Sequence, residues 1–523
     1  MASSIYRSTE YGKYHKEDNE MNRESRTIGE RSEWDALIGG EWQAASSGER
    51  FTVEEPATGE VIAQVTACGA DEIDAAVKRA RQAYDENWRW QTPRARGKLL
   101  LKAAQVIQEH AEELASLETR EVGKAFQQSL QFDVRFASDA FEYFGGLTDL
   151  VMGNFMPQGA INSTTIPEPY GVVGGIIPFN WPPIHFAGKV APALAAGNTV
   201  VLKPGEQAPL TAIRMVELLQ EVLPSGVLNI VPGLGPAGAA LVAHPLVGKL
   251  SFTGSTATGR SILKEAANRF VGVLLELGGK NPFVVFEDAD MNIAVRDAIE
   301  GMYFNQGEAC TAASLILLHE SIHDRFVSRF AQGVEKLRVG DGLDSATELG
   351  PMVNRRQQER VLSYIEVGKQ EGAKIVAQGK VPSDPRLAGG FFVPPTVFDN
   401  VDISMRIAQE EIFGPVCVIL TFSDYQEAMR LANGTEYGLT AAVYTSDTDT
   451  ANRAARDIEA GMVFINNYNR GFLGTPFGGM KSSGYGREHA IETLHEFVRT
   501  KNVRQPSGFG QIMRWSPADR VLE

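Results

Sequence analysis

From Gly171 onward, the chain alternates short, continuously apolar runs with segments of helical hydrophobic periodicity. The apolar runs before Lys280 are GVVGGII, NTVVLK, VLNIV, KLSFTG and VGVLLELGG, and helical patterns such as PLTAIRMVELLQEVL and STATGRSILKEAAN separate them. Strands that are apolar on both faces and alternate with helices are typical of a parallel sheet covered on both sides. The pattern predicts an α/β domain with the architecture of a nucleotide-binding domain.

A second set of the same kind follows Lys280, with the runs NPFVVF, SLILLH, PVCVILTF, TAAVYT and MVFINN. It predicts a second α/β domain. Two further segments fit neither set, and we expect them to pair with each other or with another subunit. The predicted organisation is an N-terminal arm at 1–33, a first domain at 34–149 and 169–280, a second domain at 281–490, and the two remaining segments at 150–168 and 491–523.

Composition narrows the class of protein. A chain of 523 residues with 43% hydrophobic content is long enough for two or three buried cores. The net charge of −15 and the lack of a dense Lys/Arg run argue against a nucleic-acid surface. Cys68, Cys310 and Cys417 are far apart and form no CxxC or Cys/His pair, so neither a disulfide framework nor a metal site is expected.

The chain shows no targeting or membrane signal. Residues 1–33 mix acids and bases and contain no apolar core of a signal peptide, and their acids also disfavour a transit peptide. The longest apolar stretch, 170–203, is interrupted by Asn180, His185, Lys189 and several prolines. We therefore expect a cytoplasmic protein that binds neither membrane nor nucleic acid.

Cys310 stands in an unusual setting. In FNQGEACTAAS, residues 304–314, small and polar residues surround it and a glycine lies nearby. Such a context suits a thiol that another molecule must reach, whereas a structural cysteine normally lies in an apolar face. A small core thiol is the alternative, and it is the preferred interpretation for Cys68 and Cys417.

Seven segments support a family resemblance. In chain order they are IIPFNWP (176–182), VLKPGEQAP (201–209), FTGSTATG (252–259), LELGGKNP (275–282), NQGEACTA (305–312), QEEIFGPV (409–416) and TPFGGMKSSGYGRE (475–488). Together they resemble the NAD(P)-dependent aldehyde dehydrogenase superfamily over essentially the whole chain after residue 34. The resemblance implies a Rossmann-type NAD domain, an α/β catalytic domain and a small oligomerisation extension, in a homodimer or homotetramer that acts on a small-molecule aldehyde.

The resemblance also implies catalytic roles. Cys310 would be the nucleophile, because a thiolate that adds to an aldehyde creates a tetrahedral centre able to expel hydride. Asn180 and the Cys310 N–H would hold the oxyanion. Glu276 would activate water against the thioester; an acid among leucines is costly to bury unless it is paired or its pKa is raised, which suits a base. Lys189 would relay the proton. The structural alternatives are a loop-capping Asn180 and a salt-bridged Glu276.

Two glycine-rich turns compete for the dinucleotide. PGLGPAG, with Gly233, Gly235 and Gly238, formally satisfies G-x-G-x-x-G after a strand. In the family, however, the pyrophosphate meets the helix that starts at STATG. The turn that corresponds to PGLGPAG lies nearer the adenine. The resemblance implies NAD as cofactor, because Glu206 would repel a 2′-phosphate, with NADP less favoured. The cofactor-binding residues that it implies are Phe179, Lys203, Glu206, Gly235, Ser255, Glu411 and Phe413.

The expected substrate tunnel is aromatic. Phe132 and Phe136 are four residues apart and would share a helix face, and Gly188 would leave room beside His185. These rings favour a bulky or aromatic aldehyde, although an aromatic stripe is often plain core. Arg470 offers the alternative of a semialdehyde with a distal carboxylate. The predicted substrate residues are Phe132, Phe136, Trp181, His185, Arg470, Phe472 and Phe477.

The chain departs from the family pattern at one position after the nucleophile. Many relatives carry an arginine five residues after the nucleophile, where this chain has Leu315. The cysteine loop must therefore be stabilised by other contacts.

Two other functions remain as alternatives. An acylating enzyme would lack an acid at the Glu276 position, and a non-catalytic scaffold protein would not need the complete set of site residues. Both rivals are disfavoured.

Overall fold

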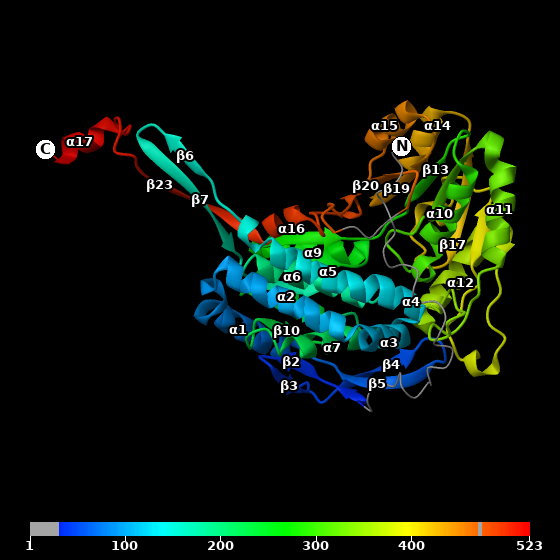
Figure 1. Ribbon diagram of the computed structural model, residues 1–523, viewed down its shortest axis with the longest axis horizontal. Coiled ribbons are helices and arrows are strands. Elements are labelled where there is room, and N and C mark those ends of the chain that lie inside the picture. Colours follow the sequence, from blue (N-terminus) through cyan, green and yellow to red (C-terminus); the bar gives the residue numbers. More distant parts are fainter. Residues whose placement is uncertain (1–30, 469–472, 523) are drawn as a thin grey trace, which may run out of the picture.

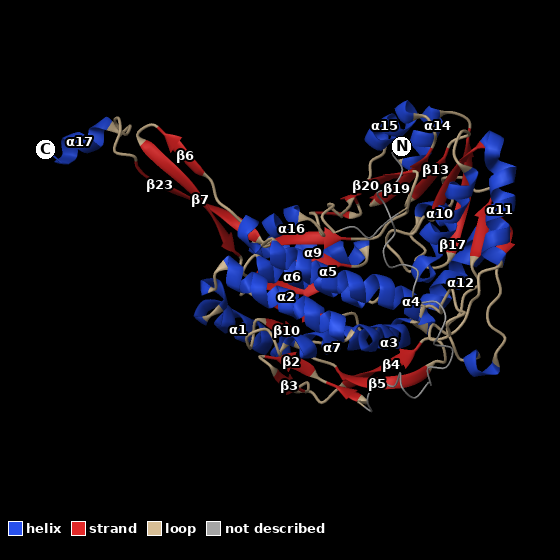
Figure 2. Ribbon diagram, viewed as in Figure 1, coloured by secondary structure: helices blue, strands red, loops and turns tan. Residues whose placement is uncertain are grey.

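The computed structural model describes residues 31–468 and 473–522. Two α/β bodies lie beside each other, and a long arm projects from the first of them (Figure 1). Figure 2 shows that helices cover the sheets of both bodies. No helix of the described residues is long and apolar enough to cross a membrane.

The first body is built on an eight-stranded sheet with the order β22-β12-β11-β8-β9-β10-β2-β3. Its five central strands are parallel, as their unbroken apolar sequences predict, and antiparallel strands close both edges. The strands are β2 (Ala36–Ile38), β3 (Glu41–Gln43), β8 (Val172–Ile176), β9 (Thr199–Lys203), β10 (Leu228–Ile230), β11 (Val247–Thr253), β12 (Gly272–Glu276) and β22 (Gly484–Tyr485).

Helices pack around this sheet. Helix α6 is buried over nearly its whole length, consistent with its apolar sequence on every side. A π-helical turn, Ser129–Val134, precedes α5 and packs against α3. The helices are α1 (Ala70–Glu86), α2 (Pro93–Glu109), α3 (Ala111–Val122), α4 (Phe126–Gln128), α5 (Arg135–Gly146), α6 (Pro182–Ala195), α7 (Leu210–Leu219), α8 (Gly235–Ala243) and α9 (Thr256–Arg269). A small separate sheet contains β1 (Glu33–Trp34), β4 (Arg50–Glu55) and β5 (Glu60–Thr66).

The second body contains a seven-stranded sheet with the order β15-β16-β17-β14-β13-β19-β20, parallel except for β15. Its strands are β13 (Pro282–Val285), β14 (Leu315–His319), β15 (Lys374–Gln378), β16 (Thr396–Asp399), β17 (Val416–Phe422), β19 (Thr440–Tyr444) and β20 (Met462–Ile465). Its helices are α10 (Met291–Tyr303), α11 (His323–Glu335), α12 (Arg355–Gln370), α13 (Arg406–Gln409), α14 (Tyr425–Ala432) and α15 (Thr448–Asp457). A two-stranded ribbon, β18 (Tyr437–Gly438) with β21 (Met480–Lys481), lies outside this sheet.

The projecting arm is a three-stranded antiparallel sheet of β6 (Phe155–Gln158), β7 (Ile161–Pro169) and β23 (Val498–Pro506). The pairing expected between the two leftover segments is present: β7 and β23 run side by side from Pro169↔Val498 to Ile161↔Pro506. Helix α16 (Ile491–Glu496) precedes β23, and α17 (Ser516–Leu522) lies beyond the arm's outer end (Figure 1).

One strand crosses the predicted boundary between the two domains. Although β22 comes from the segment 281–490, it pairs with β12 of the first sheet, Gly484 opposite Glu276 and Tyr485 opposite Leu275. The chain thus returns to the first sheet late in the sequence, beside the predicted base. Two residues of Gly-Tyr carry no strand signal that sequence periodicity could detect.

Candidate active site

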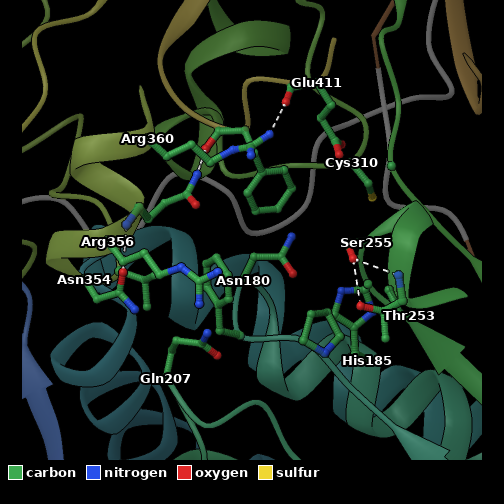
Figure 3. Close-up of a pocket in the computed structure, with 18 of the residues that line it drawn as sticks. Asn180, His185, Gln207, Thr253, Ser255, Cys310, Asn354, Arg356, Arg360 and Glu411 are labelled. Atoms are coloured by element: carbon green, nitrogen blue, oxygen red, sulfur yellow. Dashed lines mark hydrogen bonds between the residues drawn. The ribbon is translucent and has the colours of Figure 1, made fainter. Parts of the chain in front are cut away.

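A cavity of about 540 Å³ lies where the two bodies meet (Figure 3). The first body contributes residues that follow the carboxyl ends of β8, β9, β11 and β12, and the second contributes the cysteine loop and the segments around Asn354 and Glu411. Strand order reverses between β8 and β11, and ligands of open α/β sheets bind at such a switch point. The fold therefore places the cavity where a ligand site is expected.

Cys310 is held by a tightly turned loop between α10 and β14. Asn305, Gln306 and Gly307 all have positive φ, at 53°, 46° and 72°. A Cβ atom on Gly307 would lie 2.5 Å from the Gly414 carbonyl oxygen, so only glycine fits there. Cys310 is 6% exposed and lines the cavity. The turn brings the thiol to the cavity wall, on the side shared with Glu411 in Figure 3.

Asn281 fastens the cysteine loop. Its side-chain amide donates hydrogen bonds to the carbonyls of Cys310 and Ala312, both at 2.8 Å, and its Oδ1 accepts one from Thr440 N–H at 3.0 Å. The Tyr468 hydroxyl donates to the Thr311 carbonyl at 2.7 Å. Leu315, the residue that departs from the family pattern, is fully buried in β14. Hydrogen bonds from these uncharged side chains therefore hold the loop, although Leu315 replaces the arginine that many relatives carry.

Glu276 ends β12 and lines the same cavity. It is 1% exposed, and neither carboxyl oxygen has a well-formed hydrogen bond to a described residue. Burial raises the pKa of Glu276 well above its usual value; nearby Glu488 raises it further, and the Cys310 side chain and Lys189 act in the opposite direction. The site thus contains a carboxyl group with the raised pKa expected of a base that works near neutrality.

Lys189 binds Glu488, a residue that sequence reasoning missed. Its Nζ lies 2.8 Å from Glu488 Oε1 and 3.2 Å from Ser251 Oγ, and both charged side chains are buried. Both also act electrostatically on Glu276. The only sequence signal for Glu488 was an acid at the end of the glycine-rich segment 475–488.

Asn180 is held at both ends. Its side-chain amide donates to the Glu308 backbone carbonyl at 2.9 Å. Its backbone carbonyl oxygen accepts from Lys124 Nζ at 2.8 Å and from the Asn305 side-chain amide at 2.9 Å. Lys124 is itself buried with two carboxylates, Glu118 at 2.8 Å and Asp133. The π-helical turn supplies Asp133, a contact that helical periodicity could not predict.

The predicted cofactor residues fall into two groups. Phe179, Ser255, Glu411 and Phe413 line the cavity, whereas Lys203, Glu206 and Gly235 do not. Ser255 caps α9 by accepting from Thr258 N–H at 3.2 Å, so the positive end of this helix faces the cavity. No atom lies within 4 Å of a Cβ built on Gly235. Lys203 Nζ lies 3.3 Å from Glu206 Oε2.

Glu411 is packed against the β12–β13 loop. Its Oε1 accepts from Gly279 N–H at 2.9 Å, and a Cβ on Gly278 would lie 2.2 Å from Oε2, so the carboxylate occupies space that only glycine leaves. Burial raises the pKa of Glu411 to about 7. Sequence reasoning missed several polar residues that line the cavity: Gln207, Thr253, Asn354, Arg356, Gln357 and Arg360.

The predicted substrate residues do not form one continuous wall. The wider π-helical turn that contains Phe132 breaks the four-residue spacing assumed for Phe132 and Phe136. Phe132 is 40% exposed beside Phe304, whereas Phe136 is buried with its ring edge on His489. Of the five predicted substrate residues that the structure describes, His185 alone is among the residues that line the cavity. Arg470 and Phe472 lie outside the described residues, and Trp181 and Phe477 are buried.

The expectation of open space beside Gly188 is wrong. His489 fills it, with Nε2 only 3.2 Å from a Cβ built on Gly188. The Phe477 ring stacks on His489, with centroids 5.0 Å apart. The glycine therefore admits a second histidine, which the sequence segment GREHA did not reveal.

Comparison with known proteins agrees with this geometry. The pattern of the aldehyde dehydrogenase family matches residues 42–503. Aldehyde dehydrogenase citD of Monascus ruber is 53% identical over 92% of this chain and 96% of its own, and retinaldehyde dehydrogenase 3 of Mus musculus is 43% identical over 89% and 92%. The structure of betaine aldehyde dehydrogenase from Staphylococcus aureus in complex with NAD+ is similar with a TM-score of 0.89, at 40% identity over 92% of this chain and 96% of that one. The chain is an oxidoreductase that belongs to the aldehyde dehydrogenase family.

Proposed function

We propose that this protein oxidises a bulky or aromatic aldehyde to a carboxylic acid with NAD, through a thioester on Cys310. The observation that carries the proposal is that the Cys310, Asn180 and Glu276 side chains line one cavity with the N-terminus of α9. The relatives that share this family include a structure bound to NAD+.

The residues present fit the dinucleotide. The N-terminus of α9, which faces the cavity, suits a pyrophosphate, and Glu206, which is partly exposed after β9, suits the hydroxyls of a ribose. The same carboxylate would repel a 2′-phosphate, which favours NAD over NADP. When bound, the nicotinamide would accept the hydride. Phe179 and Phe413, whose rings cross at 87° with centroids 5.9 Å apart, would flank the cofactor.

Cys310 would start the reaction. Its sulfur adds to the aldehyde carbon, and the carbonyl oxygen becomes an oxyanion that the Asn180 amide and the Cys310 N–H stabilise. Such donors are each worth about 3 to 4 kcal/mol when they are fixed before the charge develops. The contact with the Glu308 carbonyl orients the Asn180 side-chain amide, and Lys124 and Asn305 hold its backbone carbonyl. Loss of hydride from the carbon then leaves a thioester.

Glu276 would complete the reaction by removing a proton from the water that attacks the thioester; the C–S bond then breaks, which releases the carboxylic acid and returns Cys310 as a thiolate. Its buried carboxyl is a stronger base than an exposed one because its pKa is raised. The Lys189–Glu488 pair lies close enough to influence that pKa and would carry the proton onward. Glu276 also disfavours the acylating reaction, in which a thiol replaces water.

The test of this proposal is the NADH absorbance that accompanies aldehyde oxidation. Wild-type protein should form NADH from NAD with benzaldehyde, and Cys310→Ala should lower kcat by several orders of magnitude while leaving NAD affinity within about threefold, because no other group near the oxyanion site supplies a thiolate. Cys417→Ala is the matched control, since that thiol is buried in β17 and absent from the cavity lining. Near wild-type turnover of Cys310→Ala would contradict the mechanism.

We also propose that the arm carries a contact between subunits. The register places Phe155 and Val503 opposite Thr164, and Ile166 two residues farther along β7 on the same face. These three apolar side chains are 62%, 40% and 43% exposed in the single chain. A three-stranded sheet with one exposed apolar face is stabilised when a partner covers that face.

A further inference from the structure

Beside the catalytic cavity, three aromatic ring nitrogens are buried without a hydrogen-bond partner among the described residues: Trp181 Nε1, His185 Nε2 and His489 Nε2. They come from one region. Trp181 precedes α6, His185 lies in its first turns with ring centroids 6.2 Å from those of Trp181, and His489 packs where Gly188 of the same helix lacks a side chain. Buried polar groups in folded proteins are almost always paired. Three such ring nitrogens in one region are therefore available to hydrogen-bond a ligand.

The two imidazoles are neutral. Burial lowers the pKa of His185 well below its usual value, with the Lys189 cation acting in the same direction. Burial likewise lowers the pKa of His489 to about 4; Glu488 opposes this shift and Lys189 adds to it. A neutral imidazole offers one donor and one acceptor, and an indole offers a donor. A ligand hydroxyl group, which both donates and accepts, matches these groups.

A carboxylate matches them less well. The cations nearest this region are already paired: Lys189 binds Glu488 at 2.8 Å, and Lys124 binds Glu118 at 2.8 Å and Asp133. An anionic substituent would therefore enter a region whose described cations are neutralised, and it would lie near the buried carboxylates. The preference is for an uncharged polar group.

The surroundings are flat and aromatic. His489 is stacked on Phe477 at an interplanar angle of 21°, and the Phe136 ring meets it edge-on with centroids 4.8 Å apart. Of the three residues, His185 lines the cavity together with Cys310 and Asn180, whereas Trp181 and His489 are buried and are not among the lining residues. Figure 3 shows the His185 ring across the cavity from Cys310. A planar ring with its aldehyde at the thiol would present its far substituents to this wall.

We propose that Trp181, His185 and His489 form a hydrogen-bonding wall that selects aromatic aldehydes carrying a ring hydroxyl group. The inference rests on the proposed aldehyde oxidation and names its substrate class. A site built to hydrogen-bond a hydroxyl discriminates strongly against an analogue that lacks it, because the buried polar groups then stay unpaired.

The first experiment compares hydroxyl with methyl, which has nearly the same size. In the wild-type protein, kcat/KM for 3- or 4-hydroxybenzaldehyde should exceed that of the corresponding methylbenzaldehyde by at least tenfold. His185→Phe and His489→Phe keep an aromatic ring but remove the nitrogen, and each should reduce the hydroxyl-to-methyl ratio at least threefold. His495→Phe, at an exposed position of α16, is the matched control and should leave the ratio unchanged. A wild-type ratio near one for both pairs, or a ratio that neither variant changes, would overturn the proposal.

The second experiment measures binding without catalysis. In Cys310→Ala, calorimetry should show that 3- or 4-hydroxybenzamide binds at least tenfold more tightly than the corresponding methylbenzamide, and adding His489→Phe should remove most of that difference. If hydroxybenzamide binding shows this pattern while no aldehyde yields NADH, the wall is supported and the proposed oxidation fails. If benzaldehydes yield NADH but the amides bind equally, the oxidation stands and the wall is refuted. Thermal unfolding of each variant separates lost binding from lost folding.

Discussion

The Glu276 carboxyl group combines two properties that conflict in an ordinary core. It is 1% exposed, yet the proposed role as a base requires its ionised form. Its neighbours resolve the conflict, because Glu488 and burial favour the protonated form whereas Lys189 and the Cys310 side chain favour the ionised form. The carboxyl is therefore responsive to small changes in its surroundings, as a group that takes up and releases protons has to be.

We expect Glu276→Gln to stop the reaction after hydride transfer. The neutral amide cannot accept a proton from water, but it leaves Cys310 and Asn180 in place. Rapid mixing of the variant with NAD and benzaldehyde should give a burst of about one NADH per active site followed by turnover at least about a hundredfold slower than wild type. Loss of the burst itself would show that Glu276 acts before the thioester forms.

The pH dependence follows from the same shift. Because the pKa of Glu276 is raised in the folded protein, its carboxyl stays protonated, and inactive as a base, to a higher pH than an exposed glutamate would. Thioester hydrolysis in the wild type should therefore increase as the pH rises through this raised pKa. The rate of the slow phase in Glu276→Gln should lack that rise; an identical pH profile in the variant would assign the titration to another group.

Glu206 is expected to set the choice of cofactor. Its side chain is partly exposed beside Lys203 at the end of β9, where a carboxylate and a 2′-phosphate would repel each other. Wild-type protein should use NAD with a higher kcat/KM than NADP, and Glu206→Gln should narrow that ratio about tenfold. The control is Glu221→Gln, an exposed position between α7 and β10 that should leave the ratio unchanged. An equal or better kcat/KM with NADP in the wild type would refute the assignment.

At the scale of elements, the cysteine loop depends on strands that are far away in sequence. Asn281 at the start of β13 and Tyr468 after β20 hold three successive carbonyls, those of Cys310, Thr311 and Ala312. Sequence reasoning noted that Leu315 removed a cation and left the replacement open, because a hydrogen bond across 157 positions leaves no local pattern. The motif LELGGKNP contains Asn281, but its sequence does not reveal what the amide binds.

We expect Tyr468→Phe to slow acylation of Cys310 with little effect on NAD affinity. The change removes the hydrogen bond to the Thr311 carbonyl at 2.7 Å, worth about 1 kcal/mol, and the longer one with Thr440 Oγ1 at 3.4 Å. The rate of single-turnover NADH formation should fall about three- to tenfold. Asn281→Ala, which loses three hydrogen bonds, should lower this rate further.

Tyr425→Phe is the matched control for this prediction. Its hydroxyl donates to Asp457 at 2.6 Å on the far side of the second body, and it should leave single-turnover formation of NADH unchanged. Equal rates in wild type and Asn281→Ala would show that the loop holds its shape without this amide.

The elements themselves were largely predictable. Every apolar run identified in the sequence forms a strand, because a strand buried on both faces has an unbroken apolar sequence. Strands at or next to sheet edges were missed, among them β15, which is partly exposed, β16, which is short, and β22, which consists of Gly484 and Tyr485. The π-helical turn was missed as well, since its extra residue leaves the composition of a helix unchanged.

At the scale of the whole molecule, the active site depends on chain segments that meet only in the folded protein. Lys189 of α6, the helix that follows Asn180, binds Glu488, about 300 positions later, and the cysteine loop comes from the other body. Family motifs named the separate residues Cys310, Glu276 and Asn180, and their shared cavity is a property of the fold. His185 was predicted as a substrate residue, but the ion pairs of Lys124 with Glu118 and Asp133 and the packing of His489 against Gly188 had no motif, so the sequence could not predict them.

The arm provides the last prediction, which concerns assembly. If a second copy covers the face formed by Phe155, Ile166 and Val503, placing charges there should separate the subunits, since each buried charge would lack a partner. Phe155→Glu combined with Ile166→Lys should shift the protein to a single-chain mass in size-exclusion chromatography with light scattering, with its far-ultraviolet circular dichroism unchanged. Arg504→Glu is the control, because Arg504 alternates with Val503 along β23 and lies on the opposite face. The wild type should elute as a dimer or tetramer; a wild-type monomer, or an assembly that survives both charges, would show that this face is not the contact.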